Sequence, residues 1–495
     1  MAIFTLIVLA FSFAYAAFQR AGVTPEWDWS LCSMGIACGL YYAVTSRTSP
    51  PSLNRLTSAV LIGFVAVAAF QIVPLPLDLV ARLSPARAEL ARASAIALGS
   101  APQSIALSVV PWTTLGYVLT LTAYALVFLV LREIALVLRN RAYCWAPIWP
   151  LLVIAAAEGA LGIYQSYAEN GEGLARGTYV NRDHYAGLLE LVLPFALLYP
   201  IAILYRHRNL HESPARPAIK ACCVLALGTV ILIAIILSQS RMAYLASLVS
   251  LFVAGSVAIA VRVLRVDPSI KASIWRKWLP IALVGLVIAL GFIFLPTDAL
   301  IGRFANLANT ENINADTRAQ IWRESVGLVK AFPIFGCGLG GYESAFSRFK
   351  TVAPMNTVDF AHNDYLQVLA EMGIVGFAVG FLLLVLVLRS AVRGAIYANS
   401  LDDRMMSVAC LASMIAILLH SLVDFNMYVP VNALAVAWIA GIAGVHVGSR
   451  RRAVAVRTAQ SSATASSAGA SRTWVSMRGS LSAVTARMRT SAAQA

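Results

Sequence analysis

Charged residues are scarce in this sequence. They make up 12% of its 495 residues, whereas 59% are hydrophobic, and the mean hydropathy is +0.76. A soluble globular domain carries about twice that share of charge. The composition therefore excludes a soluble protein and predicts an all-α polytopic membrane protein whose core lies mostly in lipid.

Residues that bind metals or form cross-links are also few. The seven cysteines lie mostly in apolar runs, and only Cys337 falls in a long polar loop, which excludes a disulfide framework. No zinc-type spacing is present. His207 and His211 have i, i+4 spacing, but they lie in a basic loop. Because the long loops also lack an Asp-x-Asp cluster, we expect neither a metal nor another cofactor.

What the sequence has in abundance is apolar runs near the ~20 residues that a bilayer requires. We predict about twelve membrane spans, at residues 2–18, 29–45, 57–74, 113–131, 146–165, 185–205, 221–239, 242–261, 278–295, 364–388, 405–424 and 427–447. The first resembles a signal peptide but lacks a positively charged start, so we interpret it as a transmembrane helix.

The basic residues predict the orientation of these spans. If the N-terminus is cytoplasmic, most of the 38 Lys and Arg residues lie in inner loops or in the tail. Both termini are then cytoplasmic, and the loop 296–363 is periplasmic. The net charge of +15 is thus mainly topological, with an anionic membrane surface rather than nucleic acid as its partner.

The segments outside the spans suggest two domains, a transmembrane unit 1–448 and a basic tail 449–495. In the loop 296–363 we predict a surface helix from about Asp316 to Ala331, ended by Pro333 and a glycine-rich turn. The loop 75–112 is either an amphipathic surface element or a re-entrant packing element. The tail is either disordered or a helix on the inner membrane surface.

Polar side chains gather near the outer ends of several spans. An ionised residue inside a bilayer costs roughly 2.5–3.5 kcal/mol, so each one is a functional candidate. The candidates are Glu158, Glu190, Arg241, His362 with Asp364, and His420 with Asp424. Each one could also be a solvated helix cap or a structural pair, and a shared depth does not show that they share a cavity.

Three features suggest a particular chemistry. A diphosphate suits Arg241 and Arg318, with Arg176 as a further candidate, because a guanidinium binds phosphate oxygens through two N–H groups. Trp322 follows Arg318 by four residues and so shares its helix face. His362 is a plausible general base, because imidazole titrates near neutral pH. After it, Gly373, Gly376 and Gly380 predict a helix face that another helix approaches closely.

The order of these residues resembles the O-antigen ligase-like family of polytopic glycosyltransferases, which includes polysaccharide polymerases. The family pattern His-[Asn/Ser/Gln], nine residues, Gly-x-x-[Gly/Thr/Tyr] is met by His362-Asn363, Gly373 and Gly376. The other matching segments are Arg241 to Leu245 for Arg-x-x-x-Leu, Arg318 and Trp322 followed by Pro333, Gly336 and Gly338, and Gly177 to Gly187 for the Gly-Thr-aromatic-x-Asn block.

The resemblance implies a GT-C-like helical fold with a large helical periplasmic loop between helices 9 and 10. It implies a metal-independent, inverting glycosyltransferase in the bacterial inner membrane, with undecaprenyl-diphosphate-linked glycan as donor and either lipid A–core or a growing polysaccharide as acceptor. By the same analogy Arg241 and Arg318 hold the diphosphate and His362 activates the acceptor hydroxyl. Candidates for contacting the glycan or supporting the site are Arg176, Asn181, His184, Glu190, Asn363 and Asp424.

Rival functions remain at this point. The motifs favour a ligase, whereas the Asn181 to Gly187 block and the Asp424-Phe425-Asn426 segment keep an O-antigen or exopolysaccharide polymerase open. Twelve spans also suit a secondary transporter, although transporter sites lie near the midplane of the membrane. A non-catalytic assembly protein is a third possibility. The sequence does not identify the sugar, the linkage or the oligomeric state.

Overall fold

The computed structural model describes residues 1–25, 27–45, 53–100, 102–140, 143–168, 173–207, 215–263, 313–351 and 357–443. The chain divides into two compact units, Met1–His446 and Val447–Ala495. The predicted span 278–295, the first part of the loop 296–363 and the tail 449–495 lie outside the described residues. So do His211 and, as a side chain, His207.

Helices account for nearly all regular structure in the described part of the chain. They occupy eleven of the twelve predicted ranges: α1 (Ala2–Phe18), α2 (Trp27–Thr45), α3 (Arg55–Phe70), α6 (Pro111–Asn140), α7 (Trp149–Ala168), α8 (Arg182–His207), α9 (Ala215–Leu237), α10 (Arg241–Val263), α15 (Asp364–Tyr397), α16 (Leu401–His420) and α17 (Pro430–Ala443). Of the helices in the described residues, seven are long and apolar enough to cross a membrane: α6, α7, α8, α9, α10, α15 and α16. This confirms a multi-pass helical membrane protein, whereas the number twelve stays a prediction.

Small residues allow the helices to pack closely. A Cβ on Gly228 of α9 would lie 3.0 Å from Ala196 of α8, and one on Gly441 of α17 would lie 2.6 Å from the carbonyl oxygen of Phe128 in α6. Lipid is as apolar as leucine, so helices in a membrane associate through such tight contacts rather than through hydrophobic burial. Large apolar side chains such as Phe11 and Phe381 are exposed instead, as lipid contact requires.

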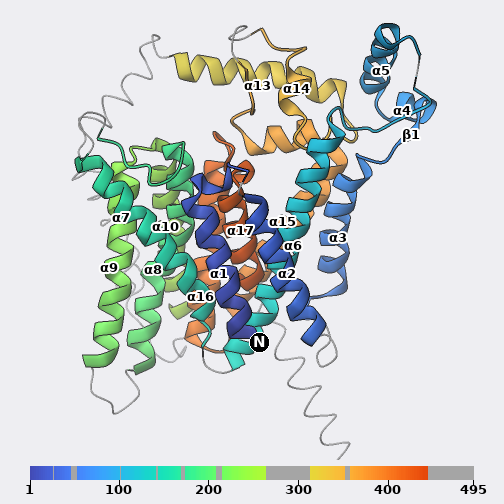
Figure 1. Cartoon of the computed structure of the whole chain (residues 1–495). Helices are drawn as coiled ribbons and strands as arrows, with labels where there is room; N and C mark the ends of the chain where they lie inside the picture. The colour runs from blue at the N-terminus through green and yellow to red at the C-terminus, as the bar shows by residue number, and fades with distance from the viewer. Residues whose placement is uncertain are drawn as a thin grey trace, which may run out of the picture. The chain divides into compact units, whose positions relative to one another are not determined.

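The two ends of the helix bundle differ in character (Figure 1). The N-terminus lies at the end opposite to α13 (Ile313–Ala331). Two ion pairs join helix ends on the N-terminal side, Arg139 to Asp403 at 2.7 Å and Arg206 to Asp402 at 2.6 Å. Basic residues thus gather at the end that the sequence predicts to be cytoplasmic, although the structure contains no membrane that would assign the sides.

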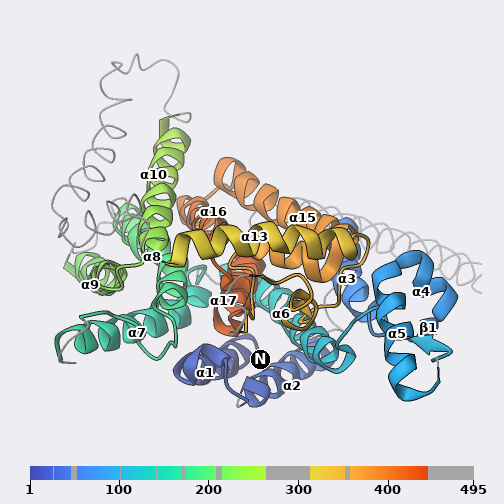
Figure 2. The same cartoon turned by 90° about the horizontal axis from the view of Figure 1, so that it is seen from above.

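At the other end, α13 lies across the bundle over α15 and α17 (Figures 1 and 2). The predicted surface helix is therefore present, and it begins at Ile313, three residues before the predicted start. A short helix, α14 (Tyr342–Phe346), follows it. Aromatic residues near the helix ends on this side are strongly exposed, including Trp29, Trp112 and Tyr167. Exposed Trp and Tyr at this level are typical of a membrane–water interface.

Residues 75–112 form a small unit on the same side. It contains α4 (Leu77–Leu83), α5 (Pro85–Leu98) and a two-stranded antiparallel ribbon of β1 (Leu75–Pro76) and β2 (Ser104–Ile105). The Val109 N–H donates to the Cys337 carbonyl at 2.8 Å, and Arg348 pairs with Glu89 at 2.9 Å. The loop is thus packed against the segment that follows α13.

The glycines of α15 do not act together as predicted, because Gly373 breaks the helix. Its φ is +61° and its ψ is −170°. The chain after Pro333 enters this break, so that Ile374 N–H donates to the Pro333 carbonyl at 2.9 Å and Val375 N–H to the Ile334 carbonyl at 3.1 Å. A Cβ at position 373 would lie 2.3 Å from the Ile334 oxygen. At position 373 α15 therefore packs against a loop rather than against a helix. The carbonyl groups of that loop accept from the Ile374 and Val375 N–H groups, which the break leaves without helical partners.

The other two glycines of this series have different neighbours. A Cβ on Gly376 would meet Met372 of the same helix at 2.4 Å, whereas one on Gly380 would meet Phe64 of α3 at 2.8 Å. The prediction of close helix contact thus holds at Gly380, is wrong at Gly373, and stays a prediction at Gly376. Periodicity alone cannot distinguish a glycine that faces a helix from one that turns the backbone.

Candidate functional site

The turn before α15 carries His362 between two anchored residues. Ala361 donates its N–H to Gln367 Oε1 at 2.6 Å and accepts from Trp322 Nε1 at 2.9 Å. Asn363 caps α15 by accepting from the Leu366 N–H at 3.0 Å. Between them, His362 has a φ of +50° and a side chain that is 31% exposed. Such a left-handed conformation costs about 1–3 kcal/mol for a non-glycine residue and is most common at functional sites.

The ring of His362 faces a buried carboxylate, Asp424, in the turn after α16. His362 Nδ1 lies 3.6 Å from Asp424 Oδ1, slightly beyond hydrogen-bond length, and the Asp424 side chain is 2% exposed. His184 Nε2 lies 3.3 Å from the same oxygen. His420 Nε2 lies 3.9 Å from Oδ2. Three histidines from three different elements thus surround one carboxylate.

The same oxygen of Asp424 serves several donors. Oδ1 also accepts the Phe425 N–H at 2.9 Å, while Oδ2 is buried without a hydrogen-bond partner among the described residues. Burial alone would raise the pKa of Asp424, but the hydrogen bonds and charge of the surrounding histidines hold that pKa well below its usual value. Asp424 is therefore an ionised carboxylate at neutral pH.

Asp424 determines which nitrogen of His362 carries the proton, because an ionised carboxylate can only accept hydrogen bonds. A carboxylate oxygen cannot donate, so the buried Nδ1 of His362 is satisfied when it is protonated. In a neutral imidazole the lone pair is then on Nε2. The site thus presents a basic nitrogen on a half-exposed ring, which is the arrangement of a general base oriented by a carboxylate.

A second carboxylate lies deeper in the bundle. Glu190 of α8 is fully buried, and its Oε1 lies 3.1 Å from His420 Nδ1. His420 therefore has a carboxylate oxygen beside each ring nitrogen, Glu190 on one side and Asp424 on the other. Both nitrogens are satisfied only when both carry a proton, which gives the imidazolium form. A cation between two buried anions reduces the cost of burying them.

The rings of the site share an aromatic support. Phe425 packs edge to face against both His184, at 4.4 Å between ring centres, and His362, at 5.0 Å. Its own face stacks on Phe360 at 4.1 Å. Edge-to-face contacts of this kind contribute about 0.5–1.5 kcal/mol beyond burial. The two imidazoles are thus held against one ring, next to one carboxylate.

The structure thus brings together five of the residues selected from the sequence: His362, Asp424, His184, His420 and Glu190. The two candidate asparagines have structural roles as helix caps. Asn363 caps α15, and Asn181 Oδ1 accepts from the Asp183 N–H at 2.8 Å where α8 begins. Glu158 orders the loop before α8, because it accepts from both the backbone and the hydroxyl of Thr178.

The candidate arginines lie on segments next to this cluster. Arg318 is on α13, one helical turn before the Trp322 that bonds to Ala361. Arg241 begins α10, which packs on α8 and α16, the helices that carry His184 and His420. Gln239, two residues before Arg241, has a φ of +53°. Arg176 is exposed in the loop whose Ala175 N–H donates to the Leu237 carbonyl at 3.0 Å. The roles of these arginines stay predictions.

One buried carboxylate was missed by the sequence reasoning. Glu371 is 1% exposed in α15 and accepts from Tyr428 Oη at 2.7 Å, from Gln367 Nε2 at 3.0 Å and from the Tyr342 N–H at 3.2 Å. It joins the chain after α13 to α15 beneath the turn that carries His362. An acidic residue inside an apolar span was the signal that could have revealed it.

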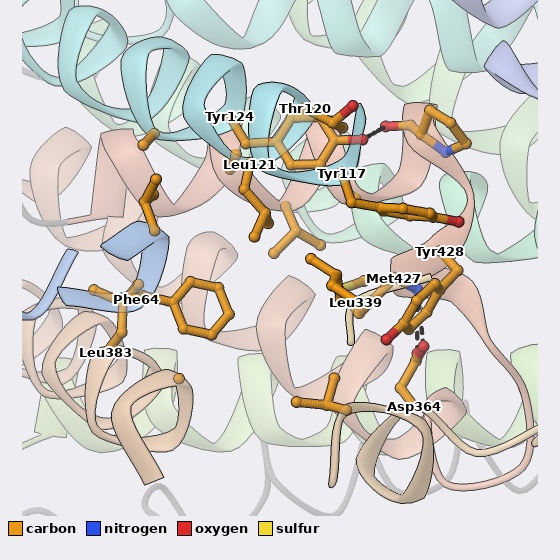
Figure 3. A pocket seen from close by; sticks show the side chains of 18 of the residues that line it. Phe64, Tyr117, Thr120, Leu121, Tyr124, Leu339, Asp364, Leu383, Met427 and Tyr428 are labelled. Carbon is orange, nitrogen blue, oxygen red and sulfur yellow. Dashed lines mark hydrogen bonds between the residues drawn. The ribbon is translucent and has the colours of Figure 1, made fainter. Parts of the chain in front are cut away.

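A cavity of about 800 Å³ lies beside the turn (Figure 3). Its lining is mostly apolar and comes from α2, α3, α6, α15, α16 and α17, with Phe64, Leu121 and Leu383 among the contributors. No Lys or Arg belongs to the lining. Phe360 and Asp364, which flank His362 two residues away on either side, line one end of it. The cavity therefore suits an uncharged chain that ends near His362.

Possible metal ligands were considered as well. Among the residues that the structure describes, no group of three or more His, Cys, Asp or Glu side chains is arranged to hold a metal ion. The described site is thus built from proton donors and acceptors.

A comparison with known families gives one match. Residues 224–381 match the family described as O-antigen ligase. The matched segment contains Arg241, Arg318 and His362 and ends before Asp424. No curated protein matches the chain. The match agrees with the resemblance seen in the motifs, and it supports an O-antigen ligase-like membrane protein over the matched residues.

Proposed function

We propose, starting from this match to the O-antigen ligase-like family, that the protein moves a glycan from undecaprenyl diphosphate to an acceptor hydroxyl at the periplasmic face of the bacterial inner membrane. The observation that carries the proposal is the pairing of His362 Nδ1 with the buried Asp424 at 3.6 Å. This pairing leaves Nε2 of a half-exposed imidazole ready to accept a proton. A base of this kind is what transfer to a hydroxyl needs.

The proposed reaction is a single displacement at the sugar carbon that bears the diphosphate. The acceptor O–H gives its proton to His362 Nε2 as its oxygen bonds to that carbon. The bond from the carbon to the diphosphate oxygen breaks, and its electron pair leaves with the diphosphate. Attack from the side opposite to the leaving group inverts the sugar carbon. Asp424 stabilises the imidazolium that His362 becomes.

Arg241 and Arg318 are the proposed binders of the leaving diphosphate. Bidentate bonds from a guanidinium to phosphate oxygens contribute about 1.5–3 kcal/mol each. These bonds strengthen as negative charge builds up on the leaving group, so they accelerate the reaction and do not only bind the donor. Because cations can supply this stabilisation, the proposed reaction needs no metal.

The remaining candidates fit supporting roles. The apolar cavity of about 800 Å³ is the proposed place for the start of the prenyl chain, since it is free of Lys and Arg and ends near His362. Arg176, in the exposed loop before α8, is a candidate for contacting the sugars. The proposed acceptor is lipid A–core for a ligase, or another lipid-linked repeat unit for a polymerase.

Purified protein in detergent tests the proposal. It would receive a polyprenyl-diphosphate oligosaccharide together with lipid A–core, or with further donor only, in the presence of EDTA. We expect transfer by the wild type and its loss in His362→Ala and Arg318→Ala. Arg323→Ala is the matched control, because Arg323 is an exposed residue on the same helix as Arg318.

The products distinguish the candidate functions. Glycan on lipid A–core would identify a ligase, and longer chains on the polyprenyl carrier would identify a polymerase that uses the same residues. Full activity of His362→Ala would refute the proposed base. If folded wild-type protein made no product from either acceptor, a secondary transporter would become the better explanation. The described polar cluster lies near the starts of α8 and α15 and the end of α16, whereas a transporter site is expected near the middle of the spans.

A further inference from the structure

His184 has a geometry that the proposed reaction does not yet use. Its Nε2 lies 3.3 Å from Asp424 Oδ1, the same oxygen that faces His362 Nδ1 at 3.6 Å. Both rings pack on Phe425. His184 is nearly buried, with a side chain that is 8% exposed against 31% for His362. His184 is therefore poorly placed to touch the acceptor but well placed to affect Asp424.

The hydrogen-bond capacity of Asp424 makes the two histidines competitors. Three nitrogens lie around Oδ1, His184 Nε2 at 3.3 Å, His362 Nδ1 at 3.6 Å and the Phe425 backbone N–H at 2.9 Å, whereas Oδ2 has only His420 at 3.9 Å. One carboxylate oxygen offers about two lone pairs to such donors. The Phe425 N–H is fixed by the backbone and takes one of them. His184 and His362 consequently share what remains.

We propose that His184 is a positioning residue that shares Asp424 Oδ1 with His362 and thereby weakens the hold of Asp424 on the base. The inference rests on the proposed function, in which His362 accepts the acceptor proton. A base must bind the proton while the bond forms and release it afterwards. An undivided bond to Asp424 would stabilise the imidazolium of His362 too well for quick release. Because His184 occupies part of Asp424 Oδ1, His362 can both accept the acceptor proton and release it afterwards.

Other charges near Asp424 remain the same when His184 is changed. Those near it are Asp183 and Glu190 on α8, Asp364 at the start of α15 and His420 on α16, and α10, which packs on α8 and α16, begins with Arg241. Glu190 and Asp424 hold His420 as a cation, so that His420 balances one buried anion. Replacing His184 therefore changes chiefly the donor on Oδ1.

Three substitutions separate positioning from packing. His184→Ala removes the donor. His184→Gln places an amide N–H where Nε2 stands, whereas the shorter His184→Asn places its amide where Nδ1 stands, away from Asp424. We expect the midpoint of the acidic limb of kcat against pH to rise by about one unit in His184→Ala and His184→Asn. His184→Gln should keep the wild-type midpoint.

The sign follows from the proton state of the base. Transfer needs neutral His362. Without the His184 contact, Asp424 interacts more strongly with His362 and favours its imidazolium form. His184→Ala should therefore lose about five- to tenfold of its activity at and below the wild-type midpoint, and little well above it. A loss of merely structural origin would lower kcat by the same factor at every pH. That result, or an unchanged midpoint in His184→Ala, would overturn the proposal.

A second measurement keeps this inference separate from the proposed function. Diethyl pyrocarbonate reacts with neutral imidazole, so its rate at His362, read by mass spectrometry of the peptide, reports the protonation of His362 without any glycan. The midpoint of this rate should shift in the same variants by the same amount. If His362→Ala retained transfer while this midpoint still shifted, the base assignment would fail and the coupling to His184 would stand.

Discussion

Replacement of Asp424 by asparagine tests the site most directly. Oδ1 already accepts the Phe425 N–H at 2.9 Å, so the asparagine oxygen should keep that place. The new NH2 group then takes the place of Oδ2, 3.9 Å from His420 Nε2, where two donors face each other. The substitution therefore preserves the shape of the site and removes its negative charge.

The magnitude follows from the distance between the charges. In the transition state His362 carries a positive charge 3.6 Å from Asp424 Oδ1. At an effective dielectric constant of ~20, two unit charges at this separation attract by about 4–5 kcal/mol. Partial exposure of His362 to water reduces this value. We therefore expect kcat to fall by about 10²- to 10³-fold, which corresponds to about 3–4 kcal/mol.

The assay is single-turnover transfer of a polyprenyl-diphosphate oligosaccharide by purified protein with saturating donor. Asp359→Asn is the matched control, because Asp359 is an exposed carboxylate three residues before His362 and should tolerate the change. Thermal unfolding of both variants reports whether the fold is intact. If Asp424→Asn retained at least a third of wild-type activity while His362→Ala was inactive, the carboxylate would not support the base and the reasoning would be refuted.

Three further predictions concern the surroundings of the site. Gly373→Ala should lower the unfolding free energy by at least about 2 kcal/mol, because position 373 has positive φ and its Cβ would lie 2.3 Å from the Ile334 oxygen; Gly63→Ala, whose Cβ meets only Val379 at 3.9 Å, should unfold at the wild-type temperature. Trp322→Phe removes the indole N–H that holds Ala361 and should lower kcat about tenfold with little change in thermal stability, whereas an equal loss of both would indicate packing alone. The lowered pKa of Asp424 stabilises the fold at pH values above the ordinary aspartate pKa of about 4, and this stability is lost as pH falls through the lower native value. In unfolding scans from pH 6 to pH 3, Asp424→Asn should lack this acid-dependent loss of stability. An identical dependence of unfolding free energy on pH in both proteins would contradict the pKa shift.

Several features of the fold could be read from the sequence because they depend on local chemistry. Apolar runs of about the length of a bilayer predicted helices at the correct places, from Ala2–Phe18 to Pro430–Ala443. The surface helix before Pro333 was found three residues from its true start. The order of the motifs around Arg241, Arg318 and His362 pointed to the family whose description matches residues 224–381.

Contacts between distant segments could not be read in this way. Gly373 was assigned to a helix–helix contact, but a loop some 40 residues earlier in the chain enters there. Asn181 and Asn363 were selected as residues that contact the glycan or support the site, and only the structure shows that their side chains cap helices. Glu371 went unnoticed, although Tyr428, Gln367 and the Tyr342 backbone converge on it.

By itself, the sequence determined a multi-pass helical membrane protein with polar residues at one level, because hydrophobicity along the chain decides which segments enter lipid. Only the tertiary structure decided which of those residues meet. It placed His184, His362 and His420 around Asp424, although these residues are up to 240 positions apart in the chain. The packing of α8 against α16 sets those distances, and a depth in the membrane carries no information about neighbours in its plane.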